Sequence, residues 1–492
     1  MQAATMRPGS AQRHHPTTAC ATVRLALCLV SAFLLISTFA TSSRADEESE
    51  RRYLLSRGDE NWAWLRNPHS TRDFWDPIKY LRLSKSRDDL FLTLGGETRQ
   101  YVEIFQNELF GSTGYVDNVA WLQRYMLHAS LRLTRYARLF VELKSGIEVG
   151  RLGGPRPVDE DFLDVNQAFI DVDAIPGRTL DDRPQLTLRV GRQEMSYGSG
   201  RLIDVRDGPV NVRLSYDAIR VLSRFSILRL DAFVARPDVT NRGLFDDGWD
   251  ATQTFWGAWT TLQVPRILVD AYYLGLDRQH AIYERGNGHE LRHTIGARVG
   301  VHVAGPLLYF EIEGAYQLGS FLRGDISAWM AVFVGVLRLP LPLQPELALG
   351  VGAASGDHSP SSTTLNTFNT LFPTGMYFGL MGFSGSPNHI APRLALSLNL
   401  TPRISFRVEA LAFWRESLND GLYNVPGFLL RPGAGNPARY VGTQLEPYLT
   451  WNIDRHFSLN GTVGYFWSGD FFRLSQPGKD VTYGAAWASY RF

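Results

Sequence analysis

The densest run of side chains able to bind a charged ligand lies at 189–213, where arginines are interleaved with carboxylates. Guanidinium groups bind carboxylate or phosphate oxygens through paired hydrogen bonds. If this segment folds into a water-filled lumen, it places such groups at a constriction. The alternative is a solvated external loop with internal salt bridges. Its charged residues are Arg189, Arg192, Arg201, Arg206 and Arg213, with Glu194, Asp204 and Asp207.

The elements that would position these groups follow a two-residue rhythm. In 404–414, for example, Arg407 and Glu409 share one face, and apolar residues occupy the other. This alternation is what a strand needs when one face meets lipid and the other meets water. A helix would spread the polar residues over several faces, so the pattern favours strands. The rhythm recurs in 91–105, 124–134, 138–149, 293–303 and 486–492.

The number and spacing of these segments predict the fold. Tight turns alternate with long links, such as 277–291 and 354–391, that are rich in loop-forming residues. We therefore expect an all-β protein: a transmembrane antiparallel β-barrel of about 18 strands, with 16 as the alternative, short periplasmic turns and long extracellular loops. Such a barrel leaves an aqueous lumen unless loops obstruct it. The segments begin near 91, 122, 137, 165, 186, 216, 227, 253, 267, 293, 308, 326, 345, 392, 404, 441, 457 and 481.

The N-terminal part differs from the rest. Residues 1–45 combine a basic start, an apolar run at 25–40 and small residues before Asp46, which predicts a cleaved secretory signal peptide. A transmembrane anchor is the alternative, but the apolar run is short for it. We expect 46–90 to be a periplasmic lead-in and 91–492 to form the barrel, which gives a multi-pass location in the cell outer membrane.

Composition narrows the functional classes. The only cysteines, Cys20 and Cys28, lie in the predicted signal peptide, so disulfides, thiolate metal sites and a cysteine nucleophile are not expected in the rest of the chain. Basic and acidic residues are nearly balanced, at 50 and 49, which argues against nucleic acid as a partner. The bilayer of the outer membrane and its lipopolysaccharide are the expected surroundings.

The polar face of the strands, together with the 189–213 run, supplies the predicted pore-lining residues. Opposite charges are about equally frequent among them, so the alternative for any one residue is a cross-strand salt bridge that stiffens the wall. The residues predicted to line the pore and conduct a substrate are Arg99, Arg124, Arg132, Lys144, Asn166, Gln167, Asp171, Arg189, Arg192, Glu194, Arg201, Asp204, Arg298 and Arg407.

Two further features allow alternatives. The acidic residues of 159–164 and 246–250 have oxygen ligands suited to Ca²⁺, but solvated acidic loops are commoner, so no metal or cofactor is predicted. The nearly uncharged loop 354–391 is expected either to fold inward or to cover the outside. No G-x-S-x-G motif occurs, since 382–386 fails at its last position, and a surface-active barrel enzyme is the least favoured function.

Several motifs resemble those of the bacterial alginate export porin family. They are Arg189-Val-Gly-Arg-Gln-Glu194, Asp204-Val-Arg-Asp-Gly-Pro209, Gly95-Gly-Glu-Thr-Arg99, Asn166-Gln-Ala-Phe-Ile-Asp171 and 371–379. The resemblance implies an 18-stranded outer-membrane channel for an anionic uronate polymer, with Arg192 in the family's Gly-Arg-Gln motif and Asp204 in the loop that follows.

The chain departs from the exporter's pattern at two places. Asn166 and Gln167 stand where the exporter has an Arg-Glu pair, and the late periplasmic turns are short. The expected function is therefore passive passage of a hydrophilic, anionic polysaccharide or polar solute, with periplasmic export scaffold proteins as potential partners. A small-solute uptake porin is the runner-up.

Overall fold

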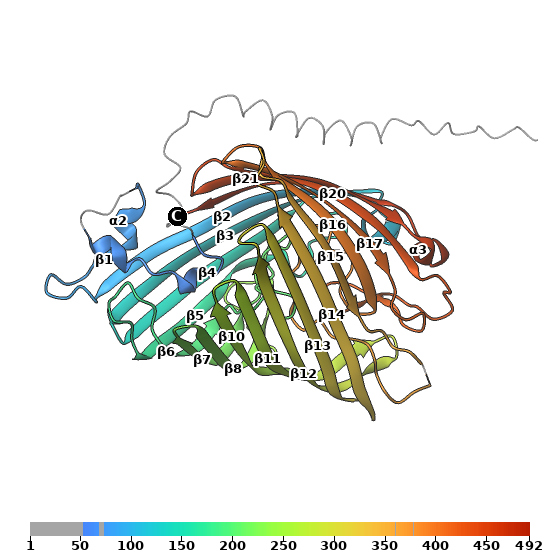
Figure 1. Ribbon diagram of the computed structural model, residues 1–492, viewed down its shortest axis with the longest axis horizontal. Coiled ribbons are helices and arrows are strands. Elements are labelled where there is room, and N and C mark those ends of the chain that lie inside the picture. The colour runs from blue at the N-terminus through green and yellow to red at the C-terminus, as the bar shows by residue number, and fades with distance from the viewer. Residues whose placement is uncertain (1–52, 68–72, 360, 377) are drawn as a thin grey trace, which may run out of the picture. The chain divides into compact units, whose positions relative to one another are not determined.

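Eighteen long antiparallel strands close into one barrel within the part of the chain that the structure, a computed structural model, describes: 53–67, 73–359, 361–376 and 378–492 (Figure 1). The predicted signal peptide, 1–45, lies outside the described residues. Among those residues, no helix is long and apolar enough to cross a membrane.

The strand starts follow the predicted ones closely at both ends of the barrel. β4, β6, β10, β11 and β17 begin at the expected residue. The barrel strands are β2 (Phe91–Gln106), β3 (Asp117–Thr134), β4 (Ala137–Val149), β5 (Asp161–Ile175), β6 (Leu186–Gln193), β7 (Tyr216–Phe225), β8 (Leu228–Val239), β10 (Gln253–Val264), β11 (Ile267–Tyr283), β12 (Gly286–Val303), β13 (Leu308–Phe321), β14 (Gly324–Arg338), β15 (Glu346–Ala354), β16 (His389–Asn399), β17 (Ile404–Trp414), β20 (Tyr440–Asn452), β21 (Phe457–Ser468) and β22 (Val481–Arg491).

The barrel closes between its first and last strands. β2 pairs on one side with β3 and on the other with β22, in the register that joins Glu97 to Arg491 and Gln106 to Thr482. Every ladder between neighbouring barrel strands is antiparallel, so backbone donors and acceptors are satisfied without a free edge. The eighteen-strand prediction is thereby confirmed.

The two-residue rhythm separates the outer face from the lumen as expected. On β4, Val141 is 45% exposed on the outer face, whereas Phe140 and Glu142 are buried inside. The same division places Ile170 outward and Asp171 inward on β5. The outer face is therefore apolar, and the charged residues of the strands are directed into the barrel.

Two extracellular segments, 194–215 and 355–388, fold into the barrel and pack against each other. Phe372 accepts a main-chain hydrogen bond from Asp204 and donates one to Leu202. Both segments contribute to an apolar cluster inside the barrel that includes Met195, Tyr197, Ile203, Leu365, Phe368 and Phe372, with wall residues such as Phe255 and Trp259. Of the two alternatives for each loop, the inward one holds.

A second apolar cluster closes the opposite side of the extracellular half. It brings together Phe110 of the short helix η5 (Glu108–Gly111), Phe471 and Phe472 of α3 (Asp470–Leu474), and Phe383. The small strands β9 (Gly248–Trp249), β18 (Leu422–Tyr423) and β19 (Leu429–Arg431) belong to extracellular loops. The lumen of the described barrel is thus substantially filled by loops.

One predicted long link proves to be strand. The interval 277–291 was expected to be a loop, but β11 and β12 run on to a two-residue turn at 284–285. Pairing continues past a bulge between Arg278 and Ala281. The strand ends near this turn carry charged residues on both faces, so the alternation that marks the rest of these strands fades.

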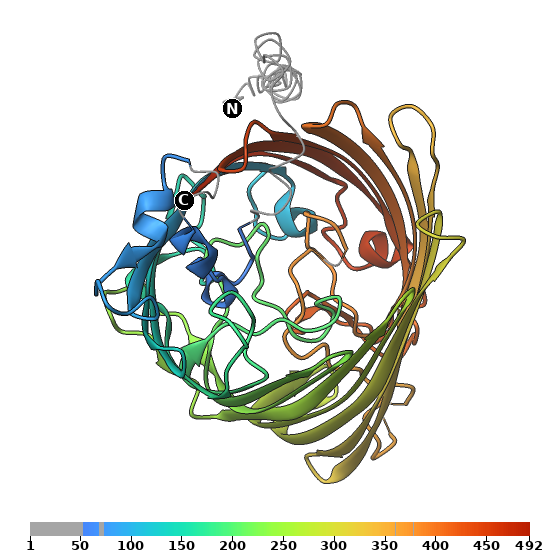
Figure 2. The same cartoon turned by 60° about the vertical axis from the view of Figure 1, so that its left-hand side comes forward.

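The lead-in contains two differently placed parts. Helix α2 (Asp76–Lys79) and strand β1 (Leu81–Arg82) lie against the periplasmic end of β2. Residues 53–67, which carry the short helices η3 (Arg57–Asp59) and η4 (Ala63–Arg66), instead lie inside the ring of strands (Figure 2). We call 53–67 the strap. The sequence indicated a lead-in but not its passage into the barrel.

Candidate functional site in the lumen

The main chemical feature of the lumen is a row of charged side chains that crosses five strands at one level. The register pairs Arg132 with Arg138, Arg138 with Asp171, Asp171 with Arg189, and Arg189 with Arg220. These residues come from β3, β4, β5, β6 and β7 in turn. We call this set the arginine row.

Asp171 is the shared acceptor in the middle of the row. Its Oδ2 accepts from Arg138 Nη2 at 2.5 Å, and its Oδ1 accepts from Arg189 Nε at 2.7 Å. Arg132 binds Asp173, which lies on β5 two residues after Asp171, at 2.7 Å. All five side chains are largely buried, so these contacts are charge-assisted bonds in a region of restricted solvent access.

The wall beside the row carries more arginines than carboxylates. Arg220 and Arg229 share a single partner, Asp231, at 3.2 and 2.5 Å. Arg224, next on β7, has no carboxylate partner among the described residues. This patch therefore contains six arginines, Arg132, Arg138, Arg189, Arg220, Arg224 and Arg229, that share three carboxylates, Asp171, Asp173 and Asp231.

A carboxylate of the strap approaches this basic patch. Asp59 Oδ1 lies 3.2 Å from Arg189 Nη1. Burial acts to raise the pKa of Asp59, but the positive charges of Arg189, Arg220, Arg138 and Arg224 outweigh it and hold that pKa below its usual range. Asp59 is therefore ionised at neutral pH.

Arginines of β2 and β3 fasten the inward loop 194–215. Arg124 binds Asp207 at 2.6 Å and Glu97 at 3.3 Å, and Arg99 donates to the carbonyl oxygens of Gly208 and Val210, each at 2.6 Å. Arg213 binds Asp207 at 3.2 Å and Glu194 at 3.5 Å. Burial raises the pKa of Asp207, but Arg213 and Arg124 outweigh it, so the pKa lies well below its usual value.

Asn166 and Gln167 act in the same fastening. Both are fully buried, and both donate to Glu142 Oε1, at 2.8 and 3.0 Å. Asn166 also donates to Glu194 at 2.9 Å. These amides connect two strands to the base of the inward loop and have no contact with open lumen. The positions at which the chain departs from the exporter's Arg-Glu pair therefore serve packing here.

The middle of the inward loop is tied to the far wall. Arg201 binds Glu311 at 2.8 Å and also contacts Glu313. Glu311 in turn binds Arg298, which pairs with Asp270 at 2.6 Å. Asp204 accepts from Ser196 Oγ at 2.8 Å, and burial raises its pKa. Arg201 and Arg298 are thereby committed to the attachment of the loop.

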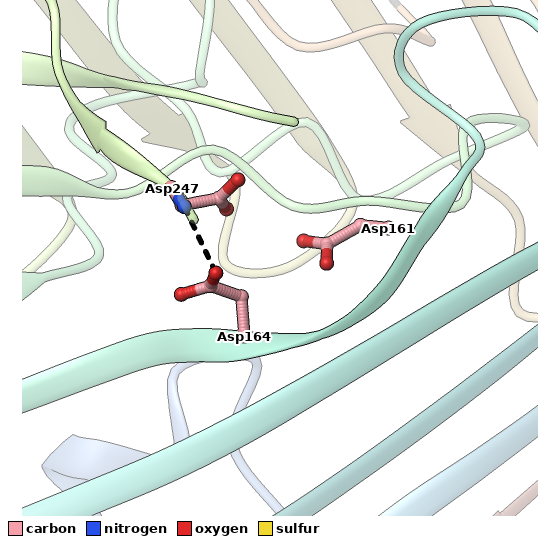
Figure 3. Close-up of side chains that lie close together, drawn as sticks. All are labelled: Asp161, Asp164 and Asp247. Carbon is pink, nitrogen blue, oxygen red and sulfur yellow. Dashed lines mark hydrogen bonds between the residues drawn. The ribbon is translucent and has the colours of Figure 1, made fainter. Parts of the chain in front are cut away.

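The acidic residues considered for Ca²⁺ do gather, but a lysine lies among them. Asp161, Asp164 and Asp247 bring one carboxylate oxygen each within 4.8 Å of one another (Figure 3). Lys144 Nζ lies 3.3 Å from Asp161 and 2.7 Å from Asp247, and it also reaches Asp238 at 3.2 Å. The ammonium thus supplies the cation at this cluster. The donor set suits Ca²⁺ in kind but is already neutralised in part.

Arg192, the arginine of the Gly-Arg-Gln motif, adjoins this cluster. Its Nη2 binds Asp217 at 3.0 Å and its Nη1 binds Asp238 at 3.0 Å. Arg407 is different, because its side chain is 30% exposed and shares Glu409 with Arg393. Among the residues predicted to conduct a substrate, Arg407 is the most accessible, and most of the others are buried in ion pairs. Their role in conduction remains a prediction.

Three members of the site could not be selected from the sequence as binding residues. Alternation places Arg138 and Arg220 on the inner face, as it does many other residues. Only the cross-strand register shows that they lie at the level of Asp171. Asp59 lies in an irregular segment with no period to indicate which side chains face the wall. The sequence indicates three members of this patch: strand alternation predicts Arg132 and Asp171 to line the pore, and the arginine content of 189–213 indicates Arg189.

Comparison with known proteins agrees with the barrel. One similar solved structure is OccAB1 of Acinetobacter baumannii, with a TM-score of 0.55 and 9% identity, which covers 85% of this chain and 99% of that one. Another is OccD3 (OpdP) of Pseudomonas aeruginosa, with a TM-score of 0.54 and 14% identity, which covers 82% of this chain and 91% of that one. A third, OccK3 (OpdO) of P. aeruginosa, has a TM-score of 0.52 and 11% identity, and it covers 82% of this chain and 95% of that one. At such identities the likeness concerns the fold. No curated protein sequence matches.

The sequence itself matches the model of one family, described as alginate export, over residues 91–485. This interval begins at the first residue of β2 and ends within β22, so it spans the whole closed barrel. It includes the arginine row and both inward loops. The chain belongs to the alginate export family of outer-membrane β-barrels.

Proposed function

We propose that this porin-type channel conducts hydrophilic solutes that carry carboxylates, either small sugar acids or an acidic polysaccharide. The observation that carries the proposal is the excess of arginine over carboxylate around the arginine row. Guanidinium groups there can replace the water around a carboxylate. The interleaved aspartates keep each arginine from holding the solute too tightly, because they compete for the same hydrogen-bond donors.

The filled lumen favours a small solute as the second candidate. Loops 194–215 and 355–388 share an apolar cluster in the extracellular half, and their main chains are hydrogen-bonded to each other. A polysaccharide chain that passes through the lumen would have to displace these contacts between the two loops. A monomeric sugar acid needs a much narrower path. Uptake of small acids is therefore the alternative to polymer export, and it uses the same arginines.

Planar-bilayer recordings test the shared part of the proposal. Under a KCl gradient, the sign of the reversal potential should indicate preference for Cl⁻, and galacturonate should reduce the current more than galactose at equal concentration. Polygalacturonate added to either side distinguishes the two candidates, since only a polymer channel should be blocked by, or translocate, the chain. Cation preference without any block by either acid would overturn the proposal.

Arg224 provides a specific variant for the same assay. Because Arg224 has no carboxylate partner in the part of the chain that the structure describes, Arg224→Gln removes positive charge without leaving a buried acid there unpaired. We expect a lower preference for Cl⁻ in this variant. Arg323→Gln, on the exposed two-residue turn between β13 and β14, is the matched control, because it makes the same change in net charge away from the lumen.

A further inference from the structure

The strap is attached to the barrel at several points other than Asp59. Arg57 binds Glu60 at 2.7 Å and donates to the main-chain oxygens of Gly96 and Phe492, at 3.1 and 2.9 Å. Asn61 donates to the carbonyl oxygen of Leu180 at 2.7 Å, in the turn between β5 and β6. These contacts tie the strap to β2 and the chain end on one side and to the β5–β6 turn on the other, so they hold the strap in place independently of the Asp59 carboxylate.

The strap also meets the inward extracellular loop. Arg213 Nη1 donates to the carbonyl oxygen of Leu55 at 3.0 Å. Gly58 lies against Phe169 of β5, where an added Cβ would come within 3.0 Å of the ring. Close contact at Gly58 brings the next residue, Asp59, up to the wall beside Arg189. The strap backbone therefore fixes where the Asp59 carboxylate is presented.

Asp59 differs from the wall carboxylates in its accessibility. Its side chain is 37% exposed, whereas those of Asp171 and Asp231 are 5% or less. Among the residues that the structure describes, Asp59 has one ion pair, to Arg189, whereas Asp171 bridges two arginines. Solvent-exposed single ion pairs are weak and exchange readily with other anions. The strap thus places an accessible carboxylate with one direct ion pair on a patch with more arginines than acids.

We propose that Arg138, Arg189, Arg220 and Arg224 form a carboxylate-binding site that Asp59 of the strap occupies as a built-in competitor. This inference rests on the proposed passage of acidic solutes and adds where such a solute binds and what it displaces. A uronate or another sugar acid that enters from the periplasmic end takes the place of the Asp59 carboxylate on the guanidinium groups. The strap backbone stays attached through Arg57 and Asn61.

The proposal explains the charge distribution at this end of the lumen. Without Asp59, the patch would hold several arginines with shared or absent partners, and an anion would bind there tightly. A tethered carboxylate lowers the apparent affinity for an external anion, because the two compete for the same donors. A site that must release its ligand for transport needs such weak net binding.

A cysteine at position 59 tests the competition directly. We would record galacturonate block in planar bilayers for the wild type and for Asp59→Cys, before and after treatment with MTSES, which adds a sulfonate, or MTSET, which adds a quaternary ammonium. Loss of the competing charge should tighten block by galacturonate about two- to fivefold, the range expected for one partly exposed ion pair. MTSES should reverse the change, and MTSET should not.

The control is Asp88→Cys, treated with the same reagents. Asp88 lies in the turn that follows β1, where it pairs with Arg82, and both side chains are about half exposed. Block should stay at the wild-type level in this variant. Wild-type protein treated with each reagent checks for effects at Cys20 or Cys28 if the signal peptide is retained.

Two results would overturn the inference. Unchanged galacturonate block in Asp59→Cys would mean that Asp59 does not compete for the site. Equal effects of MTSES and MTSET would mean that bulk rather than charge governs the change. In either case, anion preference and block in the wild type would leave the proposed function standing. Absence of both from the wild type would remove the proposed function and the inference together.

Discussion

Replacement of Asp171 by asparagine should destabilise the barrel while it raises anion preference. The carboxylate serves two buried guanidinium groups, at 2.5 Å to Arg138 and 2.7 Å to Arg189. Arg189 retains Asp59, but Arg138 has no other carboxylate partner among the described residues. Loss of one partner from a buried ion pair costs about 3–5 kcal/mol, and the amide oxygen still accepts one bond. We therefore expect a loss of about 3 kcal/mol.

The assay is urea unfolding of the protein in lipid vesicles, followed by tryptophan fluorescence. Asp88→Asn is the matched control, because its exposed pair with Arg82 should contribute less than about 1 kcal/mol. The reversal potential of the same Asp171→Asn preparation should shift toward stronger Cl⁻ preference, since one negative charge leaves the row. A loss below about 1 kcal/mol, or a shift toward cations, would refute the account of Asp171 as the shared acceptor.

Three other predictions use residues outside the row. Lys79 Nζ is buried beside the rings of Tyr53 and Trp62 without a hydrogen-bond partner, and burial, with Arg57 adding to it, lowers its pKa to about 7. The unfolded chain then binds more protons between pH 7 and 10, so stability should rise with pH across that window by at most about 1.4 kcal/mol per pH unit. Lys79→Met should reduce this slope in unfolding measured at several pH values; an unchanged slope would contradict the buried amine. Lys144→Gln should turn the cluster of Asp161, Asp164 and Asp247 into a Ca²⁺ site, seen as unfolding that becomes dependent on Ca²⁺, and a variant indifferent to Ca²⁺ would count against this reading. Arg415 is fully buried and donates to five main-chain oxygens of 418–438, so Arg415→Ala should expose that loop to trypsin in intact vesicles, whereas Arg323→Ala should not.

The strand positions could be predicted because lipid imposes a strict rule on the outer face. Every second residue of a spanning strand must be apolar, and this requirement is visible in sequence from β2 to β22. The rule ends where the strands leave the lipid. The tips of β11 and β12, on either side of the turn at 284–285, carry charged residues on both faces, so their sequence predicts a loop rather than strands.

The inward direction of the charged residues was equally predictable, but their partners were not. Alternation places Arg138 and Asp171 on the lumen side without saying that they face each other. That pairing depends on strand register, which turn lengths and bulges set, as between Glu142 and Leu143 opposite β5. The fastening of Arg99 and Arg124 to loop 194–215 depends on the inward fold of the loop, which no local pattern determines.

The filled lumen changes which arginines matter for selectivity. A barrel of eighteen strands cannot fill itself with wall side chains, so segments from both ends of the molecule occupy it. Loop 194–215 is attached through wall charges: Arg99 and Arg124 of the wall bind the loop, and the loop's own Arg201 binds Glu311 of β13. Arginines that are paired in this attachment attract a solute only weakly, because their charge is neutralised at short range. We therefore expect selectivity to depend on the arginines left in excess, Arg224 above all, rather than on the total number that face inward.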